Sequence, residues 1–184
     1  MKFLKSVLMV SAISSIASLT LLNASDAKVE QPDAVKILTK DALKAPAVHK
    51  MPANCISSDP KVIAIGDYIF HNLNGKKAKK KAPEGLAKFV TNKAGKKKAK
   101  QYGNCVACHN IEGAIGAGNI GPDLHNYKAG FIDSKARNLQ YVYQQIADSR
   151  IHDKDTRMTI NLTTGLFNEE EICAITSYIV SERK

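Results

Sequence analysis

The chain has 184 residues and a formal net charge of +10, from 27 basic and 17 acidic side chains. Hydrophobic residues make up 44% and charged residues 24%, an ordinary globular balance that excludes wholesale disorder. Tryptophan is absent and aromatic residues reach only 6%, so any large apolar group in the core would have to come from outside the chain.

Residues 1–27 have the pattern of an export signal. Two lysines precede an apolar stretch from Val7 to Leu22, and Ser25-Asp26-Ala27 offers small residues where a signal peptidase cleaves. An uncleaved membrane anchor is the alternative, but the small-residue exit favours cleavage. We therefore predict a mature chain in the periplasm, where disulfides are permitted and nucleic acid is not an expected partner. No later apolar run is long enough to span a bilayer, so no membrane span is expected after signal cleavage.

Residues 28–60 are predicted to form an extended N-terminal arm, followed by one domain over residues 61–184. The arm has few large apolar residues and four prolines, which favour an extended chain (Pro32, Pro46, Pro52 and Pro60).

A lysine-rich insertion is predicted within the domain at residues 76–100. It contains eleven lysines against Glu84 alone, so it carries the net positive charge of the mature chain. Such a charge can focus a local field, which predicts that the insertion steers an anionic partner. A solvated insertion without a partner is the alternative.

The remaining elements are predicted to be mostly α-helical. A helix is expected to begin at Pro83-Glu84, because proline suits the first turn and an acidic residue suits the helix dipole, with Gly85, Phe89 and Val90 at helical spacing. A second is expected over Ser134–Ser149, where apolar residues recur with helical spacing. A third is expected over Asn168–Glu182, with a capping box and an apolar stripe (Ile172, Ile175 and Ile179). Glycine-rich loops are expected between Gly113 and Gly130.

The run Cys105-Val106-Ala107-Cys108-His109 is a C-x-x-C-H motif, which is typical of covalent haem c attachment. Two thiols at this spacing match the two haem vinyl groups, and the following histidine can bind iron. A thioredoxin-like redox pair would need a βαβ context, and a zinc site would need a second ligand pair; the sequence has neither. The motif therefore predicts one haem c, whose porphyrin would also supply the missing apolar core.

Two further residues are predicted at the haem. Pro122 lies in a turn whose carbonyl can accept a hydrogen bond from the His109 imidazole and orient it. Met158 is the only methionine after the haem motif and is predicted to be the sixth ligand, since a thioether raises the potential as electron carriers require. His152 and His125 are rival ligands, and an open iron site is a further alternative.

Cys55 and Cys173 are the two remaining cysteines. In an exported chain an extra pair favours a disulfide. Two unrelated buried thiols, or one thiol bonded to a partner, are the alternatives.

Four blocks of the sequence together resemble the SoxX family, the small monohaem subunits of SoxAX sulfur-oxidation cytochromes. They are Gly103–His109, Gly118–Leu124, Asp155–Met158 and Glu169–Ile172, and the resemblance covers about residues 62–183. It implies a class I cytochrome c fold, mostly α, with three or more helices around the haem.

The resemblance also implies a function and partners. In this family the SoxA-type subunit carries the reaction centre of a cysteine S-thiosulfotransferase, which joins thiosulfate to a cysteine of the SoxYZ carrier protein. The SoxX haem, ligated by histidine and methionine, passes the electrons to a downstream cytochrome. By this resemblance Cys105 and Cys108 hold the haem, His109 and Met158 bind the iron, and no residue of this chain is itself catalytic. A free-standing periplasmic cytochrome c shuttle is the alternative function.

Overall fold

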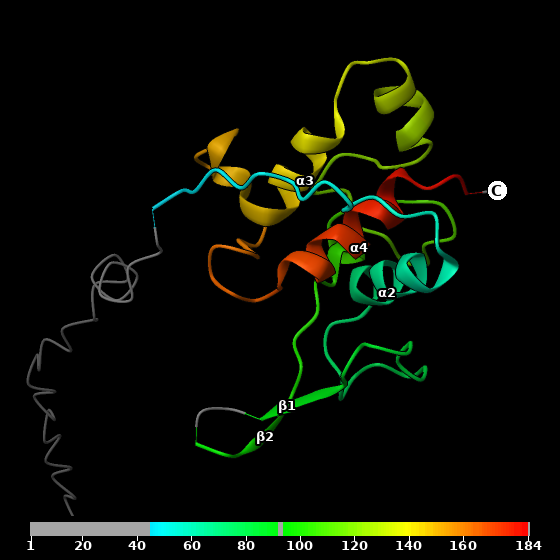
Figure 1. Cartoon of the computed structure of the whole chain (residues 1–184). Coiled ribbons are helices and arrows are strands. Elements are labelled where there is room, and N and C mark those ends of the chain that lie inside the picture. Colours follow the sequence, from blue (N-terminus) through cyan, green and yellow to red (C-terminus); the bar gives the residue numbers. More distant parts are fainter. Residues whose placement is uncertain (1–44, 92–93, 184) are drawn as a thin grey trace, which may run out of the picture. The chain divides into compact units, whose positions relative to one another are not determined.

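The computed structural model describes residues 45–91 and 94–183 (Figure 1). The predicted export signal and the first part of the predicted arm lie outside the described residues. The elements, in chain order, are helix α2 (Pro60–His71), strands β1 (Phe89–Thr91) and β2 (Lys97–Ala99), the 3₁₀ turn η1 (Cys105–Ala107), the π-helical turn η2 (Lys128–Asp133), helix α3 (Leu139–Asp148), the 3₁₀ turn η3 (Ser149–Ile151) and helix α4 (Glu169–Val180).

Helix α2 packs against α4 and was not predicted from the sequence. The sequence nevertheless contains a start signal for this helix. Asp59 caps it by accepting a hydrogen bond from the Lys61 amide, and Pro60 occupies the first turn. The two helices meet closely at Gly66, where a Cβ atom would lie 2.1 Å from the Ala174 carbonyl oxygen. Glycine is therefore required at this contact, which Figure 1 shows as the neighbouring α2 and α4.

Helix α4 confirms the prediction made for Asn168–Glu182. The Asn168 side chain accepts from the Glu171 amide and the Glu171 carboxylate accepts from the Asn168 amide, so the predicted capping box is present. The predicted apolar stripe is buried (Ile172, Ile175 and Ile179).

Helix α3 begins later than predicted, at Leu139 instead of Ser134. Lys135 has a left-handed backbone with φ of +63°, which interrupts a right-handed helix. The helix starts where Asn138 caps it by accepting a hydrogen bond from the Tyr141 amide.

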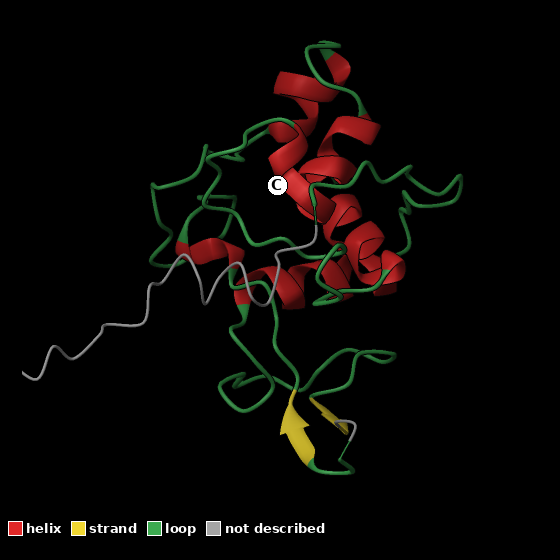
Figure 2. Cartoon of the chain, turned by 90° about the vertical axis from the view of Figure 1, so that its left-hand side faces the viewer, coloured by secondary structure: helices red, strands yellow, loops and turns green. Residues whose placement is uncertain are grey.

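The prediction of a helix beginning at Pro83-Glu84 is wrong. A turn forms there, with Gly85 at φ of +84°, and the chain continues into β1. Strand β1 pairs with β2 in an antiparallel hairpin, in which Val90 lies opposite Lys98. Figure 2 shows the two strands lying apart from the helices. All three residues of β1 are exposed, so the hairpin lacks the alternation of apolar and polar residues that identifies a half-buried strand.

The described part of the arm, residues 45–59, contains no helix and lies along α3 and α4 (Figure 1). The side chains of Gln140 and Gln144, one helical turn apart, bind its backbone. Gln144 accepts from the His49 amide at 2.7 Å and donates to the Ala47 carbonyl at 3.0 Å. Gln140 accepts from the Met51 amide and donates to the His49 carbonyl, both at 2.8 Å.

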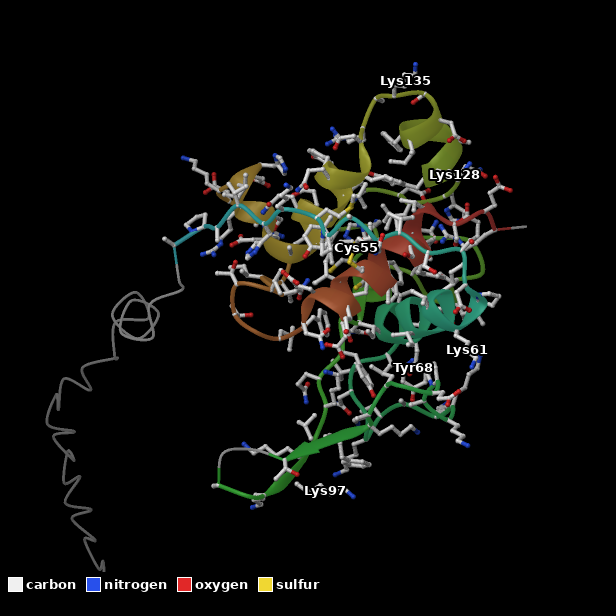
Figure 3. The ribbon with its side chains drawn as sticks, in the orientation of Figure 1. Cys55, Lys61, Tyr68, Lys97, Lys128 and Lys135 are labelled. Atoms are coloured by element: carbon white, nitrogen blue, oxygen red, sulfur yellow. A yellow bond between two sulfur atoms is a disulfide. The ribbon has the colours of Figure 1, made fainter. Side chains whose placement is uncertain are left out.

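A disulfide joins the arm to α4. Cys55 and Cys173 are bonded, as predicted from the extra cysteine pair, and Figure 3 shows the bond beside the labelled Cys55. Ser177, one turn further along α4, accepts from the Ser57 amide and donates to the Cys55 carbonyl. None of the helices within residues 45–91 and 94–183 has the length and hydropathy that spanning a bilayer requires.

Candidate functional site

A cavity of about 210 Å³ lies between the helices and the loops that connect them. Residues from most of the described elements line it. Its apolar walls come from α2, α3, α4 and the segment around η2 (Phe70, Val142, Ile146, Ile175, Ile179, Leu124, Tyr127 and Phe131). The elements thus converge on one apolar space, and the C-x-x-C-H motif lies at its edge.

The motif forms a single tight turn. Cys105 begins η1, and its carbonyl accepts from the amides of Cys108 and His109 at 3.0 and 2.9 Å. Asn104 precedes the turn with a left-handed backbone, and its amide donates to the Asn72 carbonyl at the end of α2. Cys105, Cys108 and His109 all line the cavity as a result. Neither cysteine takes part in a disulfide.

His109 is held in one orientation, with 8% of its surface exposed. Its Nδ1 lies 2.8 Å from the Pro122 carbonyl oxygen, and since a carbonyl only accepts, Nδ1 is the protonated nitrogen. The predicted orienting hydrogen bond is therefore present, and Nε2 keeps its lone pair for a metal. Gly121 makes this contact possible, because a Cβ there would lie 2.4 Å from the His109 Cε1 atom.

Met158 lines the same cavity. Hydrogen bonds on either side of it, at Thr156 and at Asn161, hold its loop in position. Before it, the Thr156 hydroxyl accepts from the Met158 amide at 3.2 Å and is bound by the Ser149 hydroxyl at 3.1 Å. After it, the Asn161 amide group donates through Nδ2 to the Ile146 carbonyl at 2.7 Å, at the end of α3. Sequence reasoning did not identify Asn161, although a buried asparagine three positions after the methionine is the anchor of this loop.

The other histidines lie outside the cavity lining. The predicted rival His152 stacks on Tyr141, with ring centroids 4.4 Å apart. The second rival, His125, binds the Asp123 carboxylate at 2.6 Å. His49 and His71 bind the hydroxyls of Thr163 and Tyr178. Of the five histidines, all within the described ranges, His109 alone lines the cavity. The only other methionine in the described ranges, Met51, belongs to the arm and packs against the hydrophobic core.

The cavity suits a large, mostly apolar group that carries polar substituents. Arg137 and Arg157 line it and supply guanidinium donors for carboxylates. Two buried oxygens of lining residues, Gln145 Oε1 and Asn161 Oδ1, have no hydrogen-bond partner in the described structure. Apolar walls, two thiols, one imidazole with a free nitrogen and arginines together fit a haem.

The surroundings of the Cys105 thiol differ from those of a thioredoxin-like redox pair. Burial raises its pKa to about 12, so it is fully protonated at neutral pH. A thioredoxin-like pair needs the opposite shift, since the thiolate is the reactive form. Within the described residues there is also no group of three or more His, Cys, Asp or Glu side chains that could hold a metal ion.

Comparison with known families agrees with this geometry. The model of the cytochrome c family matches residues 92–182. Residues 92–182 form a cytochrome c domain. Neither a curated protein nor a solved structure matches the chain.

The chain is thus an electron-transfer c-type cytochrome with a class I cytochrome c fold. It carries one haem c, attached covalently through Cys105 and Cys108. Helix α2 lies before the matched residues, yet Phe70 from α2 lines the haem cavity. Helix α2 therefore contributes to the same cavity as the matched residues.

Proposed function

We propose that His109 and Met158 are the two axial ligands of the haem iron and that the site transfers electrons without binding substrate at the metal. The observation that carries this proposal is that His109, whose Nδ1 is bound to the Pro122 carbonyl, and Met158 line the same cavity, and that they are its only histidine and methionine among the described residues. A thioether ligand favours the ferrous state, as a carrier of fairly high potential requires.

The residues around the iron have separate roles in this proposal. Pro122 fixes the tautomer of His109 and makes the ligating nitrogen more basic. Thr156 and Asn161 hold the loop of Met158. Apolar side chains keep water from the macrocycle, which limits the reorganisation that accompanies electron transfer. When bound, the haem supplies the one-electron chemistry.

We further propose that the chain is the SoxX-type subunit of an exported SoxAX complex. It would accept the electrons released when thiosulfate is conjugated to a cysteine of a SoxYZ-type carrier, and pass them to a downstream cytochrome. The support is the sequence resemblance in the blocks Gly103–His109, Gly118–Leu124 and Asp155–Met158. One residue from each of these blocks lines the cavity, which also supports the proposal (Gly103, Pro122 and Met158). Periplasmic localisation, with residues 1–27 removed, belongs to the same proposal.

The native mass and haem content of the complex test this role. The protein is purified from its own cells under non-denaturing conditions, and haem is counted per polypeptide. Co-purification with a larger haem-containing subunit, together with thiosulfate-dependent reduction of this chain's haem, is the expected result. A monomer with one haem that thiosulfate and the carrier do not reduce would support the free-standing shuttle instead.

A further inference from the structure

The lysine-rich insertion contains the antiparallel hairpin of β1 and β2; we call its described residues, 76–91 and 94–100, the lysine hairpin. At its base Lys100 Nζ lies 2.8 Å from the Glu171 carboxylate, and these two side chains are only 16% and 12% exposed. The Gly75 amide donates to the Lys100 carbonyl at 2.9 Å, and the Tyr102 hydroxyl donates to the Ala87 carbonyl at 2.9 Å. These contacts tie the base of the hairpin to the rest of the domain.

The positive charge of the lysine hairpin is displayed to solvent. Eight of its lysines are exposed: Lys76, Lys77, Lys79, Lys80, Lys81, Lys96, Lys97 and Lys98. Glu84, its one acidic residue, pairs with Lys61 outside the segment at 3.4 Å. The clustered charge is thus directed outward, and Figure 3 shows Lys97 at the strand end of the projection.

The hairpin also exposes apolar side chains on both of its faces. Phe89 and Val90 are each 43% exposed, and as neighbours in a strand they point to opposite faces. Phe89 lies on the face of Lys97, whose ammonium is 4.8 Å from the ring centroid. Val90 lies opposite Lys98 on the other face.

No residue between 76 and 100 lines the haem cavity in the described structure. A partner that accepts electrons must approach the haem, whereas a partner bound to the hairpin leaves the cavity lining untouched. The hairpin is therefore better suited to attachment than to electron exchange.

We propose that the lysine hairpin binds an anionic lipid surface. The lysines meet the phosphate headgroups, and Phe89 and Val90 enter the interfacial region from the two faces of the hairpin. A flat acidic protein surface would cover only one face, whereas a bilayer interface receives both. Combined electrostatic and apolar contact is what stable peripheral attachment requires. This attachment goes beyond the electron-transfer role and does not depend on it.

Vesicle co-sedimentation of the mature holoprotein tests the charge contribution. Binding to vesicles of equal parts phosphatidylglycerol and phosphatidylcholine is compared with binding to phosphatidylcholine alone. The triple variant Lys96→Gln, Lys97→Gln and Lys98→Gln is expected to bind the anionic vesicles about a hundredfold less tightly, since each lysine at such a surface is worth roughly fivefold. The matched control loses three exposed lysines elsewhere (Lys50→Gln, Lys135→Gln and Lys154→Gln) and is expected to bind much more tightly than the hairpin variant.

Insertion of the apolar residues is tested with a tryptophan probe, because the natural chain has none. Phe89→Trp is expected to show a blue shift of its emission with anionic vesicles, and quenching by brominated lipids. Ile115→Trp, at a position that is 95% exposed and outside the hairpin, is expected to show neither.

Three results would overturn the proposal. The first is equal binding to anionic and neutral vesicles. The second is an equal loss of binding in the hairpin variant and its matched control. The third is hairpin-dependent binding to poly-L-glutamate without binding to anionic vesicles, which would assign the surface to an acidic protein.

Discussion

The imidazole of His109 rests against the backbone of Gly121, and this contact leaves no room for a side chain. Replacing Gly121 with alanine would place a Cβ 2.4 Å from the ring, so the ring must move away from the Pro122 carbonyl. We expect Gly121→Ala to lower the thermal unfolding midpoint and to raise the midpoint potential, because His109 without this hydrogen bond is a less basic ligand and stabilises ferric iron less. Gly130→Ala is the control, since no atom lies within 4 Å of its new Cβ. Unchanged values in Gly121→Ala would show that the ring is not confined in this way.

Asp148 is a buried carboxylate that joins three parts of the structure. It receives hydrogen bonds from Arg150, from the Thr163 hydroxyl at 2.7 Å and from the Ala47 amide at 3.2 Å. The Arg150 guanidinium is the main cause that holds the pKa of Asp148 well below its usual range. Because the folded carboxyl binds its proton less tightly than the unfolded one, its contribution to stability is complete above about pH 4 and declines as the pH falls further.

This predicts how Asp148→Asn changes the pH dependence of unfolding. The variant leaves Arg150 without its charged partner and is expected to lose about 3 kcal/mol at neutral pH. Its free energy of unfolding should fall less steeply than that of the wild type below about pH 4. Denaturant titrations across this pH range measure both effects, with the exposed Asp153→Asn as control. Parallel acid slopes in Asp148→Asn and the wild type would contradict the assignment.

At the residue scale, the sequence predicted features that depend on local spacing or on a unique residue. The His109–Pro122 hydrogen bond and the Asn168 capping box are of this kind. Asn161 and Asp148 could not be predicted, because their partners come from turns and helices that only the fold brings together.

At the scale of elements, α3 binds the arm through two glutamines one turn apart. Gln144 is 3% exposed and binds the Ala47 and His49 backbone groups. We expect Gln144→Ala to lower the free energy of unfolding by about 2 kcal/mol, because it leaves buried backbone groups unpaired. Hydrogen exchange should accelerate at the His49 amide. The exposed Gln101→Ala is the control; equal exchange rates at His49 in both variants would exclude this role.

The predictions of elements succeeded where tertiary packing agrees with local sequence pattern. Helix α4 has both a cap and a continuous apolar stripe, and was predicted correctly. The segment after Pro83 has good helix-starting residues but becomes a hairpin, because its backbone pairs with residues 97–99 and its root is held by Glu171. Pairing between two separate segments cannot be recognised from the residues of one segment alone.

At the scale of the whole molecule, the disulfide closes a loop that contains most of the described chain. Cys55 and Cys173 are 118 positions apart, and the chain-entropy estimate for such a loop is at most about 5 kcal/mol. We expect the double variant Cys55→Ser and Cys173→Ser to unfold at markedly lower denaturant concentration while it retains haem. The arm should become sensitive to proteases in the variant.

Mass spectrometry of the intact, alkylated protein tests directly whether the Cys55–Cys173 disulfide is present. Unfolded protein should take up no alkyl groups without reductant and two after reduction, since Cys105 and Cys108 are occupied by haem. Uptake of two groups without reductant would show that the disulfide is absent and that the arm is held by noncovalent contacts.

The ligation of the iron by Met158 is tested most directly by comparing Met158→Ala with Met51→Ala. Both side chains are half-buried methionines, but only Met158 lines the haem cavity. Our account predicts that Met158→Ala abolishes the weak far-red absorption band of ferric iron bound to a thioether and lowers the midpoint potential. Met51→Ala should retain the band and the potential. An unchanged band and potential in Met158→Ala would contradict the proposed ligand pair.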